Sequence, residues 1–402
     1  MSVTDQELLA RFAPLFERIA RGAAARERKR MLPLDEMREL ALTGIGAVRV
    51  PVELGGAGAS LRQLFGLLRE LAAADSNLPQ ALRQHYYQVE LLLQRRQDAD
   101  AQAWLRRVVA GDLFGSATTE PHGSKLGEVS TVLRRDPAGG YRLNGRKIYG
   151  TGNAYAQWLP VGAVDEDGVP VVPRDRAGVT LLDDWDGFGQ RLTATSTTVF
   201  EDVAVSDDEV RRFPLDGPRR GGSGLHQTVL LATLAGIAQA AARDLTEIVR
   251  VKARVYFTGT GELPRDDAVV QEQVGRAQAA ADAARWILDG LGRELETAWE
   301  LWTAPGTDPA VVDAAFVEVE LAVASAQVTI SETVLDQTAH LLDVLGASSL
   351  SSRLGLDRHW RNARAIASHN PYPFKARLLG DHLLTGAEPE SFAVGKDVGD
   401  KR

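Results

Sequence analysis

The chain has 402 residues, of which 44% are hydrophobic and 25% are charged, and its 46 basic and 54 acidic residues give a formal net charge of -8. This is the composition of a globular protein with room for roughly two or three domains, and nothing in it favours nucleic-acid binding. Because the chain has no cysteine, disulfides, thiolate metal sites and cysteine nucleophiles are excluded, and we predict no metal site. The first residues hold no basic segment followed by an apolar core, and no run approaches the roughly 18 apolar residues that span a bilayer. We therefore expect a cytoplasmic protein with no membrane and no nucleic-acid partner.

Residues 1–112 are rich in Ala, Leu, Arg and Glu and predict an N-terminal helical domain. Their leucines recur at helical spacing, as Leu61, Leu64, Leu68 and Leu71 illustrate. A glycine-rich run at 44–58 invites comparison with a phosphate loop, because free amides at a helix start can hold phosphate. It lacks the G-x-G-x-x-G order of a dinucleotide site. We interpret it as a structural turn.

From residue 113 to residue 214 the apolar period changes to two, which predicts a small central β-barrel or sandwich domain. The strongest local signal is the segment 141–149, where Asn144-Gly145 is predicted to turn a tight hairpin. Further strands are expected at 157–164, 178–182 and 195–205.

Residues 222–394 return to helical periodicity and predict a C-terminal four-helix bundle, preceded by a loop at 219–224. The stretches 268–302 and 310–345 contain no proline and exceed the length of typical globular helices. Residues 395–402 are predicted to be a tail. The fold class is therefore α+β, with helices before and after a β domain.

A segment rich in arginine and histidine, D-R-H-W-R-N-A-R at 357–364, is followed by His369-Asn370-Pro371. We predict that Asp357 caps a helix that Pro371 ends. Arg358, Asn362 and His369 then share one face, and the helix C-terminus favours a protonated His369. Taken alone, the segment fits either an anion or cofactor site or a solvated helix surface.

Several separated motifs resemble, in the same order, those of the acyl-CoA dehydrogenase superfamily. They are P-x-E-x-G-G-x-G at 51–58, a T-E-P-x-x-G-S loop shortened by one residue at 117–124, G-x-K-x-W-I-T-N at 145–152, G-x-R-x-T at 189–193 and F-x-x-V-x-V at 200–205. The resemblance extends over nearly the whole chain. It implies the three-part acyl-CoA dehydrogenase fold.

Within that superfamily, D-R-H-W-R-N-A-R followed by H-x-P is similar to the reduced-flavin monooxygenases of the dibenzothiophene monooxygenase type. The dehydrogenases abstract an α-proton with a glutamate near the place where this chain has His369-Asn370-Pro371. Some dehydrogenases carry that glutamate on the long helix after the β domain, where Glu247 is the nearby candidate. The alternative function is thus an FAD-dependent acyl-CoA dehydrogenase.

The resemblance implies a two-component monooxygenase in which reduced FMN and O2 form a C4a-hydroperoxyflavin that must be shielded from water. It places three catalytic residues: Thr151 at the flavin N5 edge, His369 near the peroxide, and His85 as a proton carrier on the substrate side. The implied substrate is a small sulfur compound, such as a sulfide, thiophene or sulfone, and N-oxygenation of an amine is the alternative chemistry. We find no nicotinamide fingerprint, so a separate flavin reductase would supply diffusible reduced FMN. The family also implies a homotetramer.

The resemblance also assigns the flavin-binding residues. Those of the β domain would contact the ring and ribityl chain, whereas the helical ones would meet the phosphate, with Arg254 reaching it from a neighbouring subunit. The set comprises Ser116, Thr118, Ser124, Tyr149, Thr151, Trp185, Arg254, Gly346, Ser348 and His369.

Three positions depart from the family pattern. Ile366 stands where the monooxygenases usually have a second histidine, Ser116 replaces an asparagine, and Ser348 replaces an arginine found in some members. The assigned flavin-binding residues also have structural interpretations: Arg254 as a surface charge, Tyr149 and Trp185 as core aromatics, and Ser348 as a helix stop. A non-catalytic helical assembly protein that retained the fold stays a third alternative.

Overall fold

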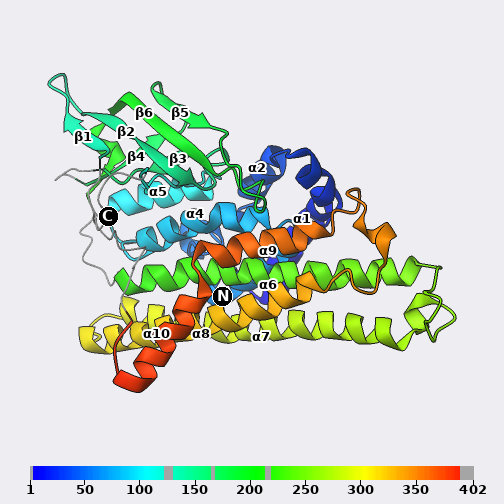
Figure 1. The fold of residues 1–402 in the computed structure, drawn as a ribbon. Coiled ribbons are helices and arrows are strands. Elements are labelled where there is room, and N and C mark those ends of the chain that lie inside the picture. The colour runs from blue at the N-terminus through cyan, green and yellow to red at the C-terminus, as the bar shows by residue number, and fades with distance from the viewer. Residues whose placement is uncertain (1–2, 122–129, 164–167, 213–218, 390–402) are drawn as a thin grey trace, which may run out of the picture.

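The computed structural model describes residues 3–121, 130–163, 168–212 and 219–389. Figure 1 shows a β domain above one end of a layer of long helices, with the N-terminal helices packed between them. The layout agrees with the predicted α+β class, because helical parts precede and follow the strands. Its first part contains α1 (Asp5–Lys29), α2 (Leu34–Leu42), α3 (Leu61–Ala74), α4 (Asn77–Leu93) and α5 (Ala99–Val109).

The glycine-rich run after α2 is a structural turn, as predicted. It contains the short 3-10 helices Ile45–Ala47 and Val52–Leu54 and folds back on itself. A Cβ atom on Gly56 would lie 2.0 Å from the carbonyl oxygen of Val50, so only glycine fits this crossing. The run thus shapes the chain and leaves no room for phosphate at Gly56.

The central domain is a sandwich of two antiparallel sheets. One has the order β1-β2-β6-β5 and the other the order β3-β4-β7, and Leu143, Phe200, Leu159 and Val172 share the buried cluster between them. The strands are β1 (Val132–Arg135), β2 (Tyr141–Gly150), β3 (Trp158–Pro160), β4 (Val169–Pro173), β5 (Val179–Leu182), β6 (Ser196–Val205) and β7 (Val210–Arg211).

The predicted hairpin at Asn144-Gly145 is wrong. Both residues lie inside the continuous strand β2, at a register shift against β6 between Leu143 and Gly145. A Cβ atom at Gly145 would lie 2.4 Å from the Thr131 hydroxyl oxygen. The Asn-Gly pair therefore marks a β-bulge, where a backbone that requires glycine meets a close neighbour.

The C-terminal part contains α6 (Arg219–Val251), α7 (Ala268–Thr303), α8 (Pro309–Ala339), α9 (Asp357–His369) and α10 (Tyr372–Thr385). The predicted loop at 219–224 is wrong, since α6 already begins at Arg219. The Gly224 amide donates a hydrogen bond to Glu320 of α8 at 3.0 Å, so packing against α8 supports a glycine-rich helix start. One long helical stretch, Gly222–Val251, is apolar enough to cross a membrane, but 89% of its most apolar window is buried within the protein.

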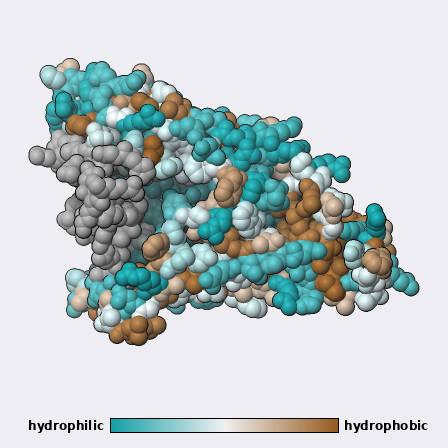
Figure 2. Space-filling model, in the orientation of Figure 1, coloured by the Kyte–Doolittle hydropathy of each residue, from teal (hydrophilic) through white to brown (hydrophobic). Residues whose placement is uncertain are grey.

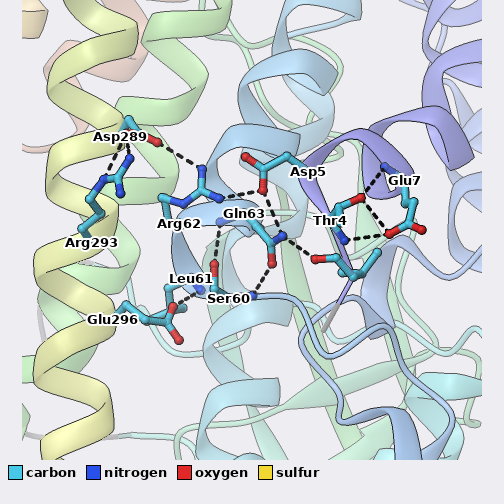
Figure 3. Close-up of polar contacts among 11 residues, drawn as sticks. Thr4, Asp5, Glu7, Ser60, Leu61, Arg62, Gln63, Asp289, Arg293 and Glu296 are labelled. Carbon is cyan, nitrogen blue, oxygen red and sulfur yellow. Dashed lines mark hydrogen bonds and ion pairs between the residues drawn. The ribbon is translucent and has the colours of Figure 1, made fainter. Parts of the chain in front are cut away.

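The N-terminal helices are fastened to the bundle by polar contacts at the start of α3 (Figure 3). Arg62 donates to Asp289 of α7 at 3.2 Å and to Asp5 of α1 at 2.6 Å, and the Leu61 amide donates to Glu296. Close packing continues along α3, because a Cβ atom on Gly236 of α6 would lie 2.4 Å from Ala72. These contacts fix α4, which follows α3, against the bundle.

Candidate functional site

Loops of the β domain meet α4 at Thr151. This residue follows β2, and a Cβ atom on neighbouring Gly152 would lie 2.3 Å from the carbonyl oxygen of Ala81 in α4. The Thr151 hydroxyl lies 3.1 Å from that of Thr195, which lies 2.7 Å from that of Thr193. The result is a chain of three hydroxyl groups at the junction between the domains. Figure 2 shows a hollow with hydrophilic surface where the β domain meets the helices.

Ser116 and Thr118 lie in the loop beside this junction. The buried side chain of Asn153 accepts a hydrogen bond from the Ser116 amide at 2.7 Å and donates one to its carbonyl at 2.9 Å. Thr118 is exposed, and its loop is anchored by a buried ion pair of Lys147 with Glu120 at 2.6 Å. The charge of Lys147 and hydrogen bonds from Ser130 and Thr131 hold the pKa of Glu120 well below its usual range. Predicted Ser124 lies outside the described residues.

Tyr149 and Trp185 form an aromatic pair at the surface of the same domain. Their rings meet edge to face, with centroids 6.3 Å apart, and Tyr149 is 57% exposed. Tyr149 has φ of 55°, a left-handed conformation that is unfavourable for a tyrosine. The Trp185 indole donates to the Gly189 carbonyl at 3.2 Å. Tyr149 is exposed and Trp185 is partly buried, so the pair offers apolar surface to a flat ligand.

Helix α9 carries the arginine- and histidine-rich segment, and its polar groups mostly fasten the helix to its neighbours. Arg358 and His359 both bind Asp244 of α6, at 2.7 and 2.9 Å. Arg361 reaches Glu27 of α1 at 3.0 Å, and Asn362 accepts from the amide of Gln190 at 2.7 Å. Most of the segment therefore holds the helix in place, and Trp360, Arg361 and Asn362 contact the 184–195 loop.

The predicted capping role of Asp357 is wrong. The helix begins at Asp357 itself, with Leu356 in the cap position, and the Asp357 carboxylate binds Arg361 at 2.8 Å. The C-terminal end agrees with the prediction, because α9 stops at His369, just before Asn370-Pro371.

Helix α4 places His85 four residues after Ala81, on the face that meets Gly152, and beside Phe114 of the loop that carries Ser116. The imidazole is fully buried. Nδ1 accepts from the Phe114 amide at 3.1 Å, and Nε2 donates to the Gly46 carbonyl at 2.9 Å. Burial lowers the pKa of His85 to about 4. Both nitrogens are occupied and the ring stacks on Phe114, so these contacts hold the ring in place, and its role as a proton carrier on the substrate side stays a prediction.

The other face of α4 carries Arg83, Gln84 and Tyr87, which the spacing of three and four residues brings together. His226, in the second turn of α6, lies against them. Its Nε2 is 3.1 Å from the Gln84 side-chain oxygen, and its ring centroid is 4.4 Å from that of Tyr87. Burial and the charge of Arg83 lower the pKa of His226 to about 3. The motifs in the sequence gave neither Arg83 nor His226 a role.

His369 completes this group from the end of α9. The charge of Arg83 lowers the pKa of His369 to about 3, although the imidazole is exposed in the single chain. The predicted protonated His369 is therefore wrong, because repulsion by a nearby guanidinium outweighs attraction by the helix C-terminus. Ile366 is buried in the main core, so the replaced histidine position faces different surroundings from His369.

The predicted phosphate-binding residues gather elsewhere. Arg254 and Ser348 are exposed, and Lys252, just after α6, donates to the carbonyl of Leu345 beside Gly346. Lys252 is 26 residues along the chain from His226, which corresponds to about 40 Å along a helix. In one chain, the phosphate group and the junction group are thus at opposite ends of α6 (Figure 1).

A cavity of about 400 Å³ lies at neither of these places. It is lined by Arg49, Glu90 and Glu296, among others, near the C-terminal ends of α4 and α7. Arg49 binds Glu90 at 2.7 Å and lies 3.8 Å from Glu296. Because its charged groups satisfy one another, we take the junction of α4, α6 and α9 with the β domain as the candidate site.

Comparison with known families agrees with this architecture. Acyl-CoA dehydrogenase models match in chain order: the N-terminal domain at residues 6–112, the middle domain at 115–203 and the C-terminal domain at 228–372. The chain belongs to the acyl-CoA dehydrogenase family. This confirms the resemblance read from the motifs.

Within this family the chain is similar to monooxygenases. A probable FMNH2-dependent monooxygenase, SfnC, from Pseudomonas putida is 25% identical over 92% of this chain and 93% of its own length. A dibenzothiophene monooxygenase from Mycolicibacterium goodii is 28% identical over 88% of each chain, and the L-evernosamine nitrososynthase of a Micromonospora species is 33% identical over 77% of this chain and 79% of its own. Among solved structures, FMN-bound TdsC from Paenibacillus sp. A11-2 superposes with a TM-score of 0.86 at 25% identity, covering 96% of this chain and 98% of that one.

Proposed function

We propose that this protein is a flavin-dependent monooxygenase that uses reduced FMN and O2 to oxygenate a small, sulfur-containing molecule. The observation that carries the proposal is the electrostatic environment of two histidines at the site. Two histidines with lowered pKa values face a guanidinium, and among the described residues no carboxylate contributes to those shifts. Relatives named as FMNH2-dependent and dibenzothiophene monooxygenases support the same chemistry.

The alternative of an acyl-CoA dehydrogenase lacks a base at this place. Glu247 is exposed and lies 21 residues after His226 on the same helix, which is about 30 Å along its axis. A carboxylate at that distance is out of reach of a substrate held at the junction.

The residues at the junction suit a flavin ring. A flat aromatic ring with polar edges needs apolar surface and hydrogen-bonding groups. Tyr149 and Trp185 supply the first, and the Thr151 hydroxyl and the Ser116 backbone supply the second. Arg254 and the Gly346 loop would hold the phosphate of a flavin bound to a neighbouring copy, because they lie at the far end of α6. We therefore propose a homotetramer whose sites combine residues from two subunits, in agreement with the sequence-based expectation.

When bound and reduced, FMN supplies the two electrons that activate O2. One oxygen atom then enters the substrate, while the other leaves as water with two protons. At neutral pH, His226 and His369 are uncharged, and His226 already bonds the Gln84 side chain and the Gly222 backbone. We assign to His369 the positioning of the reacting oxygen, to His226 the support of this wall of the site, and to Thr151 the contact with the flavin. We also propose a cytoplasmic enzyme, and the FMNH2-dependent relative supports a separate flavin reductase as the source of reduced FMN.

Nitrogen oxygenation is the second candidate. The nitrososynthase relative supports it, and the same electron balance applies to an amine.

The test supplies the purified protein with reduced FMN, 18O2 and matched sulfides, sulfones and amines. We expect one 18O atom in the product, and a loss of at least tenfold in kcat for His369→Ala. Glu247→Gln is the control and should keep full activity. Loss of activity in Glu247→Gln, or electron transfer from an acyl thioester to retained FAD, would establish the dehydrogenase instead.

A further inference from the structure

Arg83 is a partly buried cation at the candidate site, and no carboxylate among the described residues binds it. In the part of the chain that the structure describes, its Nε is inaccessible to solvent and makes no hydrogen bond. Burial alone lowers the pKa of Arg83 to about 10, with no carboxylate opposing the shift. An arginine in this state still carries its charge at neutral pH.

Other buried cations in the protein are compensated. Lys147 binds Glu120 at 2.6 Å, and Arg49 binds Glu90 at 2.7 Å. Arg211 donates to Gln88 at 2.7 Å and lies over the rings of Trp104 and Phe114. Each of these three cations thus has a side-chain partner, a carboxylate for Lys147 and Arg49 and neutral groups for Arg211, whereas Arg83 has none among the described residues.

The position of Arg83 explains why its charge stays uncompensated. It shares the face of α4 with Gln84 and Tyr87, and those residues contact His226. Its charge also acts on His369 at the end of α9. Three elements thus surround the guanidinium with neutral, polar or aromatic groups. A charge in such surroundings is less stable than in water unless an opposite charge arrives.

We propose that Arg83 binds the substrate, and that the substrate carries an organic oxyanion, either a sulfinate or a carboxylate. This inference rests on the proposed monooxygenase function and names its substrate class. The planar guanidinium offers parallel N–H donors that match two oxygens of such a group. Gln84 and Tyr87 border the same space with an amide and a phenol. The anion on Arg83 holds the molecule while its reacting atom faces His226 and His369.

Anion binding also changes the two histidines. Arg83 repels a proton on either imidazole, so an oxyanion paired with Arg83 weakens that repulsion. The pKa values of His226 and His369 then rise. Tyr87, the remaining titratable group that contacts His226, has its own pKa raised by burial and stays neutral. Histidine NMR titrations with and without benzenesulfinate would show this rise.

Direct binding tests the site without turnover. Calorimetry with benzenesulfinate, benzoate and neutral methyl phenyl sulfide is carried out on the full chain, with and without FMN. We expect at least one of the two anions to bind, and Arg83→Gln to weaken it at least tenfold. Arg83→Lys keeps the charge but not the fork of donors, and should lose less. Arg276→Gln, which removes an exposed arginine on α7, is the matched control and should bind like the wild type.

Several results would overturn the inference. One is unchanged anion binding in Arg83→Gln; another is failure of both anions to bind the wild type at millimolar concentration. If Arg83→Gln fails to fold, Arg83→Lys provides the test. A lysine variant that binds the anions and the sulfide with the same affinities as the wild type would contradict a forked contact. In turnover, Arg83→Gln should raise KM for the anion at least tenfold and change kcat/KM for the sulfide less than threefold. Anion binding with no oxygenation of any compound would leave the binding site standing and reject the proposed function.

Discussion

The two faces of helix α4 differ in how their polar groups are satisfied. On one face, His85 and Tyr86 are fully buried, and each polar atom binds the backbone: His85 binds Gly46 and Phe114, and the Tyr86 hydroxyl binds Ile45 at 2.8 Å. On the other face, Arg83 has no partner among the described residues and Tyr87 makes no hydrogen bond that the structure describes. Polar residues on the two faces of α4 thus differ: the polar atoms of one set have hydrogen-bond partners, whereas those of Arg83 and Tyr87 have none among the described residues.

The difference shows which polar residues are available to a ligand. Buried polar groups in proteins almost always have a hydrogen-bond partner, so a group without one marks either strain or a missing ligand. A histidine with both nitrogens occupied supports the fold. A guanidinium with none of its charge compensated is available for binding.

The largest expected effect comes from His85→Ala. The substitution removes a fully buried ring and leaves the Phe114 amide and the Gly46 carbonyl without partners. We expect a loss of about 3–5 kcal/mol in the free energy of unfolding, measured by urea denaturation. His369→Ala, at the exposed end of α9, should change stability by less than about 0.5 kcal/mol. Equal losses of unfolding free energy in the two variants would contradict the difference between the two faces of α4.

The pH dependence of stability tests the same contrast. His85 has a folded pKa of about 4, compared with 6.5 when unfolded. Between these values the unfolded chain binds more protons, so stability is present above pH 6.5 and is lost as the pH falls. From pH 6.5 to 5 we expect His85 alone to account for a loss of about 2 kcal/mol.

The control for this experiment is His340, whose pKa is raised by Asp343 and Asp336. Its contribution has the opposite sign: it is complete below pH 6.5 and disappears as the pH rises through the folded pKa. His340→Asn should therefore leave the acid-side loss intact. His226, His359 and His369 also have lowered pKa values and contribute to the loss of stability over the same range. An acid-side loss of equal size in the wild type and in His85→Ala would therefore show that His85 is not buried as a neutral ring.

Arg83→Met should increase stability. It replaces an uncompensated buried charge with an apolar side chain of similar length, and such replacements commonly stabilise by about 1–2 kcal/mol. The expected gain in thermal or urea denaturation accompanies loss of anion binding. A destabilisation of more than about 1 kcal/mol would mean that Arg83 has a structural partner.

The smallest expected effects come from a pair of adjacent tyrosines. Tyr86→Phe leaves the Ile45 carbonyl unsatisfied and should cost about 1 kcal/mol. Tyr87→Phe, on the face toward His226, should cost less than about 0.5 kcal/mol. The two variants differ from the wild type by one oxygen atom each, so urea denaturation compares the faces directly. A larger loss in Tyr87→Phe would reverse the comparison.

Much of the fold could be predicted from the sequence because hydrophobic periodicity and helix-breaking residues act locally. Helical and strand periods located the three parts of the chain, and Pro371 placed the end of α9. The errors arose where a local sequence signal was overruled by packing. Asn144-Gly145 has the residues of a hairpin turn, but its pairing with β6 and the approach of Thr131 make it a bulge. Likewise, the glycines at 219–224 indicate a loop, whereas the start of α6 packs on α8.

The amino-acid sequence by itself determined the family, the absence of cysteine chemistry and the set of residues from which a flavin site could be built. Only the tertiary structure decided which of them face one another. His85 and Arg83 lie two residues apart, and their opposite roles follow from the side of α4 on which each projects. His226 and His369 come from distant helices, and the low pKa of each depends on the charge of Arg83 across the gap. Electrostatic coupling and hydrogen-bond satisfaction are properties of distances between side chains, and those distances exist only after the helices have packed.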